Sequence, residues 1–104
     1  MRVLLVCAGG LSTSMLMKKM SKYAAEHGID LEIAARGANE VKNGDGWDVV
    51  LLGPQIGYQA DKIKAKLGDT PMDVMPMLEY GRQNCEAIFA RIDKALGKLS
   101  GAGR

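Results

Sequence analysis

Residues 3–20 read VLLVCAGGLSTSMLMKKM, and this stretch decides the fold of the chain. Its first residues are apolar and mostly branched, which predicts a buried strand over Arg2–Val6. From Leu11 to His27, apolar residues recur at the spacing of a helix, and Gly28 supplies a stop signal. A strand therefore passes almost directly into a helix, and Cys7 lies at the corner between them.

The same alternation of strand and helix continues along the chain. Further strands are predicted at Leu31–Ala35, Asp48–Leu52 and Met72–Met75. Apolar stripes with helical spacing predict two more helices, the first at Ile56, Ala60, Ile63 and Leu67, and the second at Cys85, Ile88, Phe89, Ile92, Leu96 and Leu99. One helical turn is expected in the crossover, around Asn39 to Lys42. The pattern predicts an α/β fold in which helices cover both faces of a parallel sheet.

All strands of such a sheet end at the same edge, and ligands bind at that edge in open sheets of this kind. Three segments follow strands there and are expected to be loops: CAGGLSTS, GPQIGYQ and PMLEYG. Each contains glycine together with proline or polar residues, whereas the strands before them are almost purely apolar. We therefore expect the function to reside on these three segments.

Length and composition limit the classes of protein to consider. The 104 residues suit one domain, with 47% hydrophobic and 25% charged residues as in soluble globular proteins. We expect a domain over 1–97 and a flexible C-terminal tail over 98–104. No apolar run approaches the roughly 20 residues of a membrane span, and no signal peptide is recognisable. We therefore expect a cytoplasmic protein without direct membrane insertion.

Charge and cysteine spacing narrow the partners further. The formal net charge of +2 is scattered along the chain, which argues against nucleic acid as the main partner. The two cysteines do not have the spacing of a zinc site or of a thioredoxin-type redox site. We therefore expect no metal and no cofactor.

The segment after Cys7 has the composition of an anion-binding site. Backbone N–H groups of the loop and of the first helical turn would converge on the sulfur, and this positive pole favours a thiolate. Two glycines permit a tight turn, and three hydroxyl groups can cap the helix or donate to anionic oxygens. We predict that Cys7 is a nucleophile and that a phosphate group is held by Ala8, Gly9, Gly10, Leu11, Ser12, Thr13 and Ser14.

Other phosphate-binding motifs fit less well. The nucleotide motifs G-x-x-x-x-G-K-[ST] and G-x-G-x-x-G are absent. A cysteine phosphatase loop, C-x5-R, would place an arginine where this chain has Thr13. The segment Gly53-Pro54-Gln55 offers no carboxylate as general acid. The segment that starts at Cys7 is therefore typical of a phosphocarrier. A low-molecular-weight phosphatase-like hydrolase and an anion- or redox-sensing regulatory module remain alternatives.

The remaining candidate residues divide into secondary site residues and structural ones. Gln55, Tyr58 and Tyr80 are secondary candidates, because they lie on the segments after the third and fourth strands. Cys85 lies on an apolar stripe and is predicted to pack in the core. His27 ends a helix and is predicted to cap it or to be solvated.

Three motifs resemble one bacterial family. CAGGLSTSMLMKKM resembles the phosphocysteine loop of the enzyme IIB proteins of the phosphotransferase system, lactose/cellobiose/chitobiose type, which typically show C-x-x-G-M-S-T-S; Leu11 stands where methionine is usual. WDVVLLGPQIGYQ and DVMPMLEYG are similar to the family's third and fourth strands with the turns that follow. The resemblance covers roughly residues 1–96. It departs at Gln83-Asn84-Cys85, where members often carry a methionine–aspartate–glycine element.

The resemblance implies a fold and a reaction. The fold is a four-stranded parallel sheet of order 2-1-3-4, like that of the low-molecular-weight tyrosine phosphatases. The reaction is phosphotransfer: Cys7 accepts a phosphoryl group from a phosphohistidine of enzyme IIA and passes it to a sugar bound by the membrane enzyme IIC. Cellobiose, chitobiose and lactose are candidate sugars, and the loop does not distinguish them.

Enzyme IIA and enzyme IIC would both have to bind close to Cys7, which would need an adaptable surface near the loop that follows it. Leu11, Met15 and Met17 are candidates for this surface, because methionine side chains adapt to several partners. Core packing is an equal alternative for Met15 and Met17. Transient relays have small interfaces, so we expect a monomer or a weak oligomer.

Overall fold

The computed structural model describes residues 1–7, 11–41 and 46–97. Strands and helices alternate along these segments: β1 (Arg2–Cys7), α1 (Leu11–Glu26), β2 (Glu32–Gly37), β3 (Val49–Leu52), α2 (Ala60–Leu67), β4 (Met72–Val74), α3 (Met77–Arg82) and α4 (Cys85–Ala95). Two 3-10 helices follow the second and third strands, η1 (Ala38–Glu40) and η2 (Pro54–Gln59).

The four strands form one parallel sheet of order β2-β1-β3-β4, as the family resemblance implied. The apolar strands β1 and β3 occupy the two central positions, where both faces are covered. In the register, Cys7 lies opposite Gly37 of β2, and Val6 lies opposite Leu52 of β3. The N–H of Gly53 donates to the carbonyl of Val6 at 2.8 Å, which extends the pairing to the end of the sheet.

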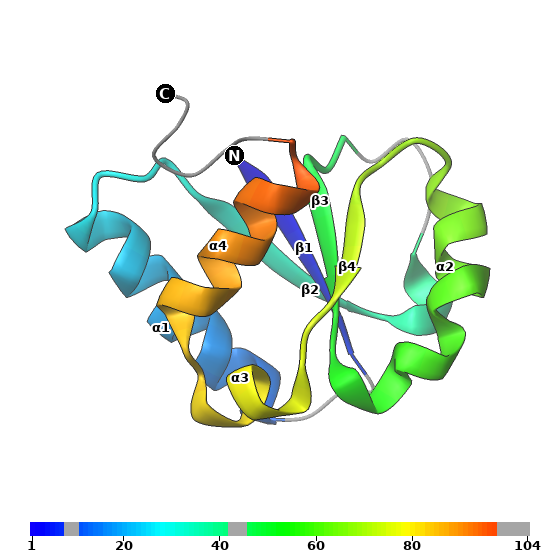
Figure 1. The fold of residues 1–104 in the computed structure, drawn as a ribbon, viewed down its shortest axis with the longest axis horizontal. Helices are drawn as coiled ribbons and strands as arrows, with labels where there is room; N and C mark the ends of the chain where they lie inside the picture. Colours follow the sequence, from blue (N-terminus) through cyan, green and yellow to red (C-terminus); the bar gives the residue numbers. More distant parts are fainter. Residues whose placement is uncertain (8–10, 42–45, 98–104) are drawn as a thin grey trace.

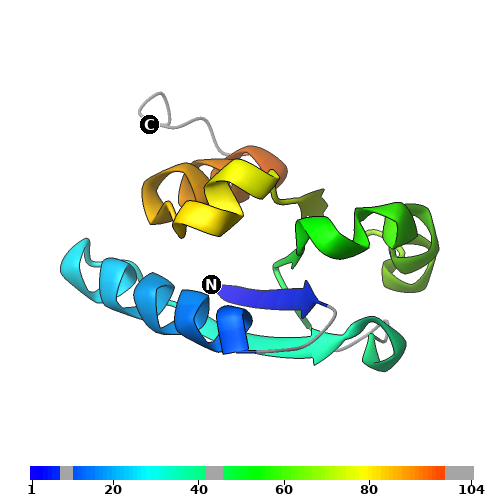
Figure 2. The same cartoon turned by 90° about the horizontal axis from the view of Figure 1, so that it is seen from below.

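Side chains alternate along the central strands, so the two faces of the sheet carry separate cores. Val3 and Leu5 face α1, α3 and α4, and they pack with Leu16, Met20, Ile88 and Ile92. Leu4 and Val6 face the opposite side and pack with Ile56, Ile63 and Leu67 of η2 and α2. Figure 1 shows α1, α3 and α4 on one side of the sheet and α2 on the other, and Figure 2 shows the same division from below.

The strands all end at the same edge, as predicted. This edge lies at the bottom of Figure 1, where α1 and α3 begin. Cys7 is the last residue of β1 and belongs to this edge. The far end of α1 is closed as expected, since Gly28 follows the helix with a φ of 68°, in the left-handed region that glycine adopts without strain.

The prediction that PMLEYG is a loop was wrong. Met77–Arg82 forms the short helix α3, which Pro76 precedes as N-cap residue and Gln83 ends in the left-handed region with a φ of 52°. Tyr80 is buried in this helix and packs on the core between α1 and α4. A long-range contact therefore stabilises a helix too short for its own periodicity to reveal.

The prediction that GPQIGYQ is a loop was also wrong, because Pro54 begins the 3-10 helix η2 there. Ile56 belongs to η2 and not to the helix that carries Ile63. The helical turn expected in the crossover is η1, at 38–40, while residue 42 lies outside the described residues. The last helix ends at Ala95, and Leu99 and the tail 98–104 also lie outside the described residues.

Candidate active site around Cys7

Cys7 ends an interior strand, and glycines flank it on both sides. Gly37 pairs with it across β2. On the other side, a Cβ added to Gly53 would lie 3.7 Å from the Cβ of Cys7. The same point over Gly53 lies 3.1 Å from Oε1 of Gln55, so the amide of Gln55 lies over this glycine on the side of Cys7, and only 8% of Cys7 is exposed.

Two hollows lie at this strand end, and Cys7 lines both. The α1-side hollow has a volume of about 200 Å³ and is lined by Cys7, Thr13, Ser14, Ala35, Arg36, Gly37 and Glu40. The η2-side hollow has a volume of about 370 Å³ and is lined by Cys7, Gly37, Ala38, Asn39, Glu40, Ile56, Tyr58 and Gln59. Cys7 thus ends a buried strand and also belongs to a concave, partly polar surface.

Two hydroxyl residues of the predicted phosphate-binding segment reach this surface from the first turn of α1. Thr13 is buried, and its Oγ1 shares a hydrogen bond of 3.3 Å with the phenol of Tyr80. Ser14 is exposed and lines the α1-side hollow. The predicted cradle residues Ala8, Gly9 and Gly10 lie outside the described residues. The backbone of Leu11 and Ser12 begins α1, while their side chains also lie outside the description.

The structure separates the three secondary candidates. Tyr58 lines the η2-side hollow and is 83% exposed, with its phenol oxygen accepting a hydrogen bond of 3.1 Å from Nε2 of Gln59. Gln55 is exposed and lines neither hollow, but its Oε1 lies over Gly53, the glycine beside Cys7. Tyr80 also lines neither hollow, and it reaches the site through Thr13. Tyr58 is therefore placed for contact with a ligand or partner, and Tyr80 for positioning Thr13.

Several residues at the site escaped the sequence analysis, chiefly Arg36, Gly37 and Glu40. All three belong to the end of β2 and to η1, which the sequence presents only as a crossover. The backbone N–H of Gly37 donates to Oε1 of Glu40 at 2.9 Å, and this bond fixes the carboxylate beside both hollows. A carboxylate thus reaches the site from η1, although the segment after β3 has none. No local pattern in the sequence marks Glu40, because its place at the site follows from the pairing of Cys7 with Gly37 in the sheet.

The second cysteine has different surroundings. Cys85 begins α4, is half-buried and packs against the core that contains Phe89, as predicted. Burial raises the pKa of the Cys85 thiol, and the positive charge of Lys19 opposes this shift. A raised pKa reduces the thiolate fraction near neutral pH. Cys85 is therefore a packing residue and not a second nucleophile.

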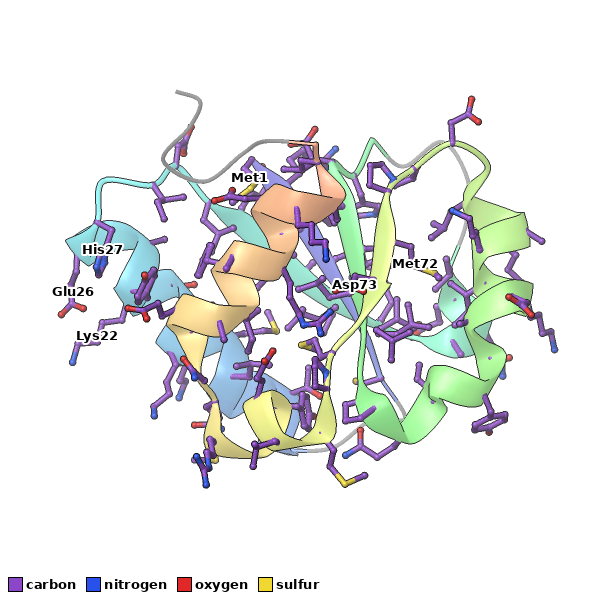
Figure 3. The ribbon with its side chains drawn as sticks, viewed as in Figure 1. Met1, Lys22, Glu26, His27, Met72 and Asp73 are labelled. Carbon is purple, nitrogen blue, oxygen red and sulfur yellow. The ribbon has the colours of Figure 1, made fainter. Side chains whose placement is uncertain are left out.

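His27 lies at the end of α1 that is remote from the site, as Figure 3 shows. It is exposed, its Nδ1 donates to the carbonyl oxygen of Tyr23 at 2.9 Å, and its ring stacks on Tyr23 with centroids 3.9 Å apart. The prediction of a capping, solvated histidine is confirmed.

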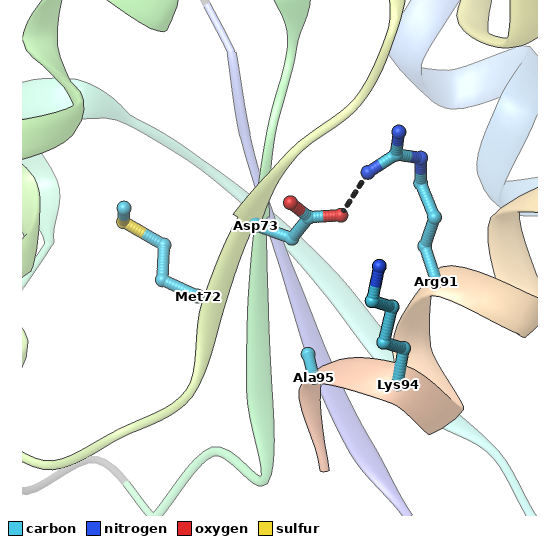
Figure 4. A pocket seen from close by; sticks show the side chains of 5 residues that line it. All are labelled: Met72, Asp73, Arg91, Lys94 and Ala95. Carbon is cyan, nitrogen blue, oxygen red and sulfur yellow. Dashed lines mark hydrogen bonds and ion pairs between the residues drawn. The ribbon is translucent and has the colours of Figure 1, made fainter. Parts of the chain in front are cut away.

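A further pocket of about 270 Å³ lies between β4 and α4 (Figure 4). Arg91 crosses it and donates to Asp73 at 2.7 Å and to Glu79 at 3.1 Å, so that α4 is tied to both β4 and α3. The hydrogen bond to Asp73 is the main cause of the raised pKa of Arg91. Because both carboxylates are satisfied by one guanidinium, we assign this cluster to the stability of α3 and α4.

No group of His, Cys, Asp and Glu side chains in the described ranges has the geometry to hold a metal ion. Among the helices described, none is both long enough and apolar enough to cross a membrane.

Comparison with known proteins identifies relatives over almost the whole chain. Residues 2–91 match the family described as "PTS system, Lactose/Cellobiose specific IIB subunit". The chain is 38% identical over 102 residues to the galactose-specific EIIB component of Lactococcus lactis subsp. cremoris, covering 90% of this chain and 94% of the relative. It is 34% identical over 65 residues to a lactose-specific EIICB component of Lactococcus lactis subsp. lactis, covering 62% of this chain and 11% of that protein.

A solved structure is similar as well. The solution structure of the cellobiose-specific phosphotransferase IIB component from Borrelia burgdorferi superposes with a TM-score of 0.71 and 31% sequence identity. The match covers 93% of this chain and 92% of that one.

Proposed function

Because the chain belongs to the lactose/cellobiose-specific IIB family of the phosphotransferase system, whose members are sugar-specific phosphotransferases, we propose that Cys7 is its phosphoryl carrier. The observation that carries this proposal is the position of Cys7. It ends an interior strand, lies between two glycines and lines two hollows that also contain hydroxyl and charged side chains.

The proposed reaction has two transfers. The Cys7 thiol first loses its proton to solvent, and the thiolate attacks the phosphorus of a phosphohistidine on an enzyme IIA partner. The S–P bond forms while the N–P bond breaks, and the electron pair of that bond stays on the imidazole nitrogen. A sugar hydroxyl on enzyme IIC then attacks the same phosphorus; the S–P bond breaks, the thiolate is regenerated, and the hydroxyl proton passes to a base or to solvent. Positioning and charge stabilisation dominate such transfers.

The residues around Cys7 suit retention of the phosphoryl group better than its release to water. Thr13 occupies the position at which a C-x5-R phosphatase loop has its arginine, so that guanidinium is missing from the loop itself. We propose that the segment 8–14 supplies the oxygens' hydrogen-bond donors, with Thr13 held in place by Tyr80. Gln55 is kept as a secondary candidate, because its Oε1 lies 3.1 Å from the point where a Cβ on Gly53 would stand, and that point is 3.7 Å from the Cβ of Cys7.

Partner docking is proposed for the rim of the strand-end edge. Among the side chains that the structure describes, four large apolar ones are exposed on α1, η2 and α3, which all begin at this edge: Met15, Tyr58, Met77 and Leu78. Met17 instead packs partly against the core. Members of the family work with a membrane enzyme IIC, and one relative carries both parts in its EIICB name. We propose that enzyme IIA and enzyme IIC bind this rim in turn.

We further propose a cytoplasmic protein that associates only transiently with the membrane component and is a monomer or a weak oligomer by itself. The sugar is proposed to be of the cellobiose, chitobiose or lactose type, since similar proteins are named for cellobiose, galactose and lactose. Within that class, the choice of sugar is expected to rest on enzyme IIC.

The proposal is tested by phosphoryl uptake from a phosphorylated enzyme IIA of the same operon, followed by intact-protein mass spectrometry and peptide mapping. We expect one phosphoryl group per chain, on Cys7, with the acid and iodine sensitivity of a thiophosphate. The matched control is Cys85→Ser, which retains uptake, whereas Cys7→Ser loses it. Rapid turnover of an aryl phosphate through Cys7 would indicate a hydrolase instead, and uptake on another residue would refute the assignment.

A further inference from the structure

Gly53 and Gln55 follow β3 directly beside Cys7. The register that pairs Val6 with Leu52 places Gly53 next to Cys7, and the N–H of Gly53 donates to the carbonyl of Val6 at 2.8 Å. A Cβ added to Gly53 would lie 3.7 Å from the Cβ of Cys7 and 3.1 Å from Oε1 of Gln55. The amide of Gln55 therefore occupies the space over this glycine, on the face of the sheet to which the Cys7 side chain belongs.

The backbone holds Gln55 in this place from both sides. Pro54 precedes it as the first residue of η2, and the proline ring restricts the backbone there. Ile56 follows it and is buried in the core on the α2 side of the sheet, while its N–H donates to the carbonyl of Gly53 at 3.1 Å. The attachment point of the Gln55 side chain is thus fixed by the fold, although the residue itself is exposed.

The amide of Gln55 is available to a ligand. Nε2 of Gln59 donates to the phenol oxygen of Tyr58 at 3.1 Å, whereas Gln55 makes no hydrogen bond within the described segments. An amide nitrogen carries two N–H donors, and half a turn about the last side-chain bond exchanges it with the oxygen. Gln55 can therefore donate to the oxygens of a phosphoryl group on Cys7. An amide has no titration near neutral pH, so it does not accept a proton from water.

We infer that Gln55 donates a hydrogen bond to the phosphoryl group on Cys7 and, because it is not a base, keeps this group from being transferred to water. The inference rests on the proposed function, since it requires a phosphoryl group on Cys7. In hydrolysis, water attacks the phosphorus and loses a proton, while the S–P bond breaks and its electron pair returns to the sulfur. A carboxylate at residue 55 would accept that proton, whereas the amide binds the same oxygens and leaves the phosphoryl group for a sugar hydroxyl.

The first measurement follows the loss of the phosphoryl group from phosphorylated protein by intact-protein mass spectrometry, with no partner present. Gln55→Glu replaces the amide by a carboxylate of nearly the same shape and is expected to speed this loss by at least about tenfold. The difference from the wild type should disappear as pH falls and the new carboxylate becomes protonated. The matched control, Gln83→Glu, introduces the same charge at the end of α3, in a residue that lines neither hollow with Cys7.

Gln55→Ala removes the hydrogen-bond donor without adding a base. Phosphoryl uptake from phosphorylated enzyme IIA should therefore slow by about tenfold, while hydrolysis stays within about twofold of the wild-type rate.

The second measurement needs no phosphoryl donor. In a Cys85→Ala background, inorganic phosphate is expected to protect Cys7 from alkylation by iodoacetamide, which is followed by mass spectrometry. Gln55→Ala should raise the phosphate concentration needed for half protection by about tenfold, because a hydrogen bond to a charged group is lost. Gln83→Ala, the matched control, should leave that concentration unchanged.

The outcomes separate the inference from the function on which it rests. Faster hydrolysis in Gln55→Glu alone, together with weaker phosphate protection in Gln55→Ala, supports the inference. Equal rates of hydrolysis in Gln55→Glu and Gln83→Glu overturn it, even if Cys7 is phosphorylated normally. Hydrolysis that is as fast in Gln55→Ala as in Gln55→Glu also overturns it, because the effect would then need no base. If neither the wild type nor any variant takes up a phosphoryl group while phosphate protection is weaker in Gln55→Ala alone, the carrier function fails and the contact of Gln55 with an anion at Cys7 stands.

Discussion

Cys7 and Cys85 carry the same thiol in one chain, and the fold gives them different surroundings. Cys85 has more exposed surface and lines a hollow with Lys19 and Lys22, yet its partial burial raises the pKa of its thiol. Cys7 is 8% exposed, yet glycines stand on both sides of it and it lines two hollows. Exposure alone would rank Cys85 above Cys7, the proposed phosphoryl carrier, as the more accessible thiol. Because both cysteines line hollows, the difference lies in their positions: Cys7 ends an interior strand at the strand-end edge, whereas Cys85 packs against the core and has a raised pKa.

The largest expected difference is in phosphoryl transfer. Cys7→Ser should lower the rate of phosphoryl uptake by at least about a thousandfold, because a serine hydroxyl does not ionise near neutral pH. Cys85→Ser should stay within about twofold, since its thiol has no part in the reaction. Stopped-flow quenching and intact-mass analysis measure both rates. The comparison breaks if the two variants lose similar amounts of activity.

Loss of the hydrogen bond between Thr13 and Tyr80 is expected to have a smaller effect on phosphoryl uptake. Tyr80→Phe leaves the buried Oγ1 of Thr13 without its partner at 3.3 Å, which should cost about 1 kcal/mol of unfolding free energy. Because Thr13 belongs to the proposed phosphate-binding segment, uptake should also slow several-fold.

A double-mutant cycle with Thr13→Val measures the coupling between these two residues, and Tyr23→Phe is the matched control. Tyr23 stacks with His27 and Phe89, away from Cys7, so its variant should not slow phosphoryl uptake. Additive effects of Tyr80→Phe and Thr13→Val on uptake would show that the hydrogen bond does not position the segment.

Around Cys85, by contrast, substitutions should change stability alone. Asn84 caps α4 by accepting the N–H of Ala87 at 3.2 Å. Asn84→Ala should lower the unfolding free energy by about 1 kcal/mol and leave phosphoryl uptake unchanged. Urea denaturation and the uptake assay provide the two readouts. If Asn84→Ala lowers phosphoryl uptake by more than it lowers the fraction of folded protein, the segment Gln83-Asn84-Cys85 belongs to the site. The expected difference between the surroundings of Cys7 and Cys85 would then be wrong.

The smallest effect concerns the titration of Cys85 itself. Its pKa is raised in the folded protein from an ordinary value of 9.0, chiefly by burial. The unfolded chain therefore releases this proton first, so stability is complete below pH 9.0 and falls as pH rises from there through the folded-state pKa. Cys85→Ala should flatten this alkaline decline in urea denaturation.

Lys19→Gln should raise the pKa of Cys85 further and slow its alkylation, because the positive charge that opposes the shift is removed. Alkylation of Cys7 in the same sample is the internal reference. A faster reaction at Cys85 would contradict the assigned sign.

Much of the fold could be predicted because its signals are local. The apolar runs of β1 and β3, the helical spacing of α1 and the glycine after it lie within short windows of sequence. The order of the strands came from the resemblance to a family and not from these patterns. The helices α3 and η2 were missed, because α3 is stabilised by the burial of Tyr80 and η2 by Pro54 and the packing of Ile56.

The sequence by itself determined that Cys7 ends a buried strand at the ligand-binding edge and that a hydroxyl-rich helix start follows it. Only the tertiary structure decided which residues line the hollows together with Cys7, such as Gly37 and Glu40 from β2 and η1, and that Tyr80 bonds Thr13. The reason is physical. Hydrophobic periodicity is a property of neighbouring residues, whereas the pairing register between strands and the packing of α3 depend on contacts between residues far apart in the chain.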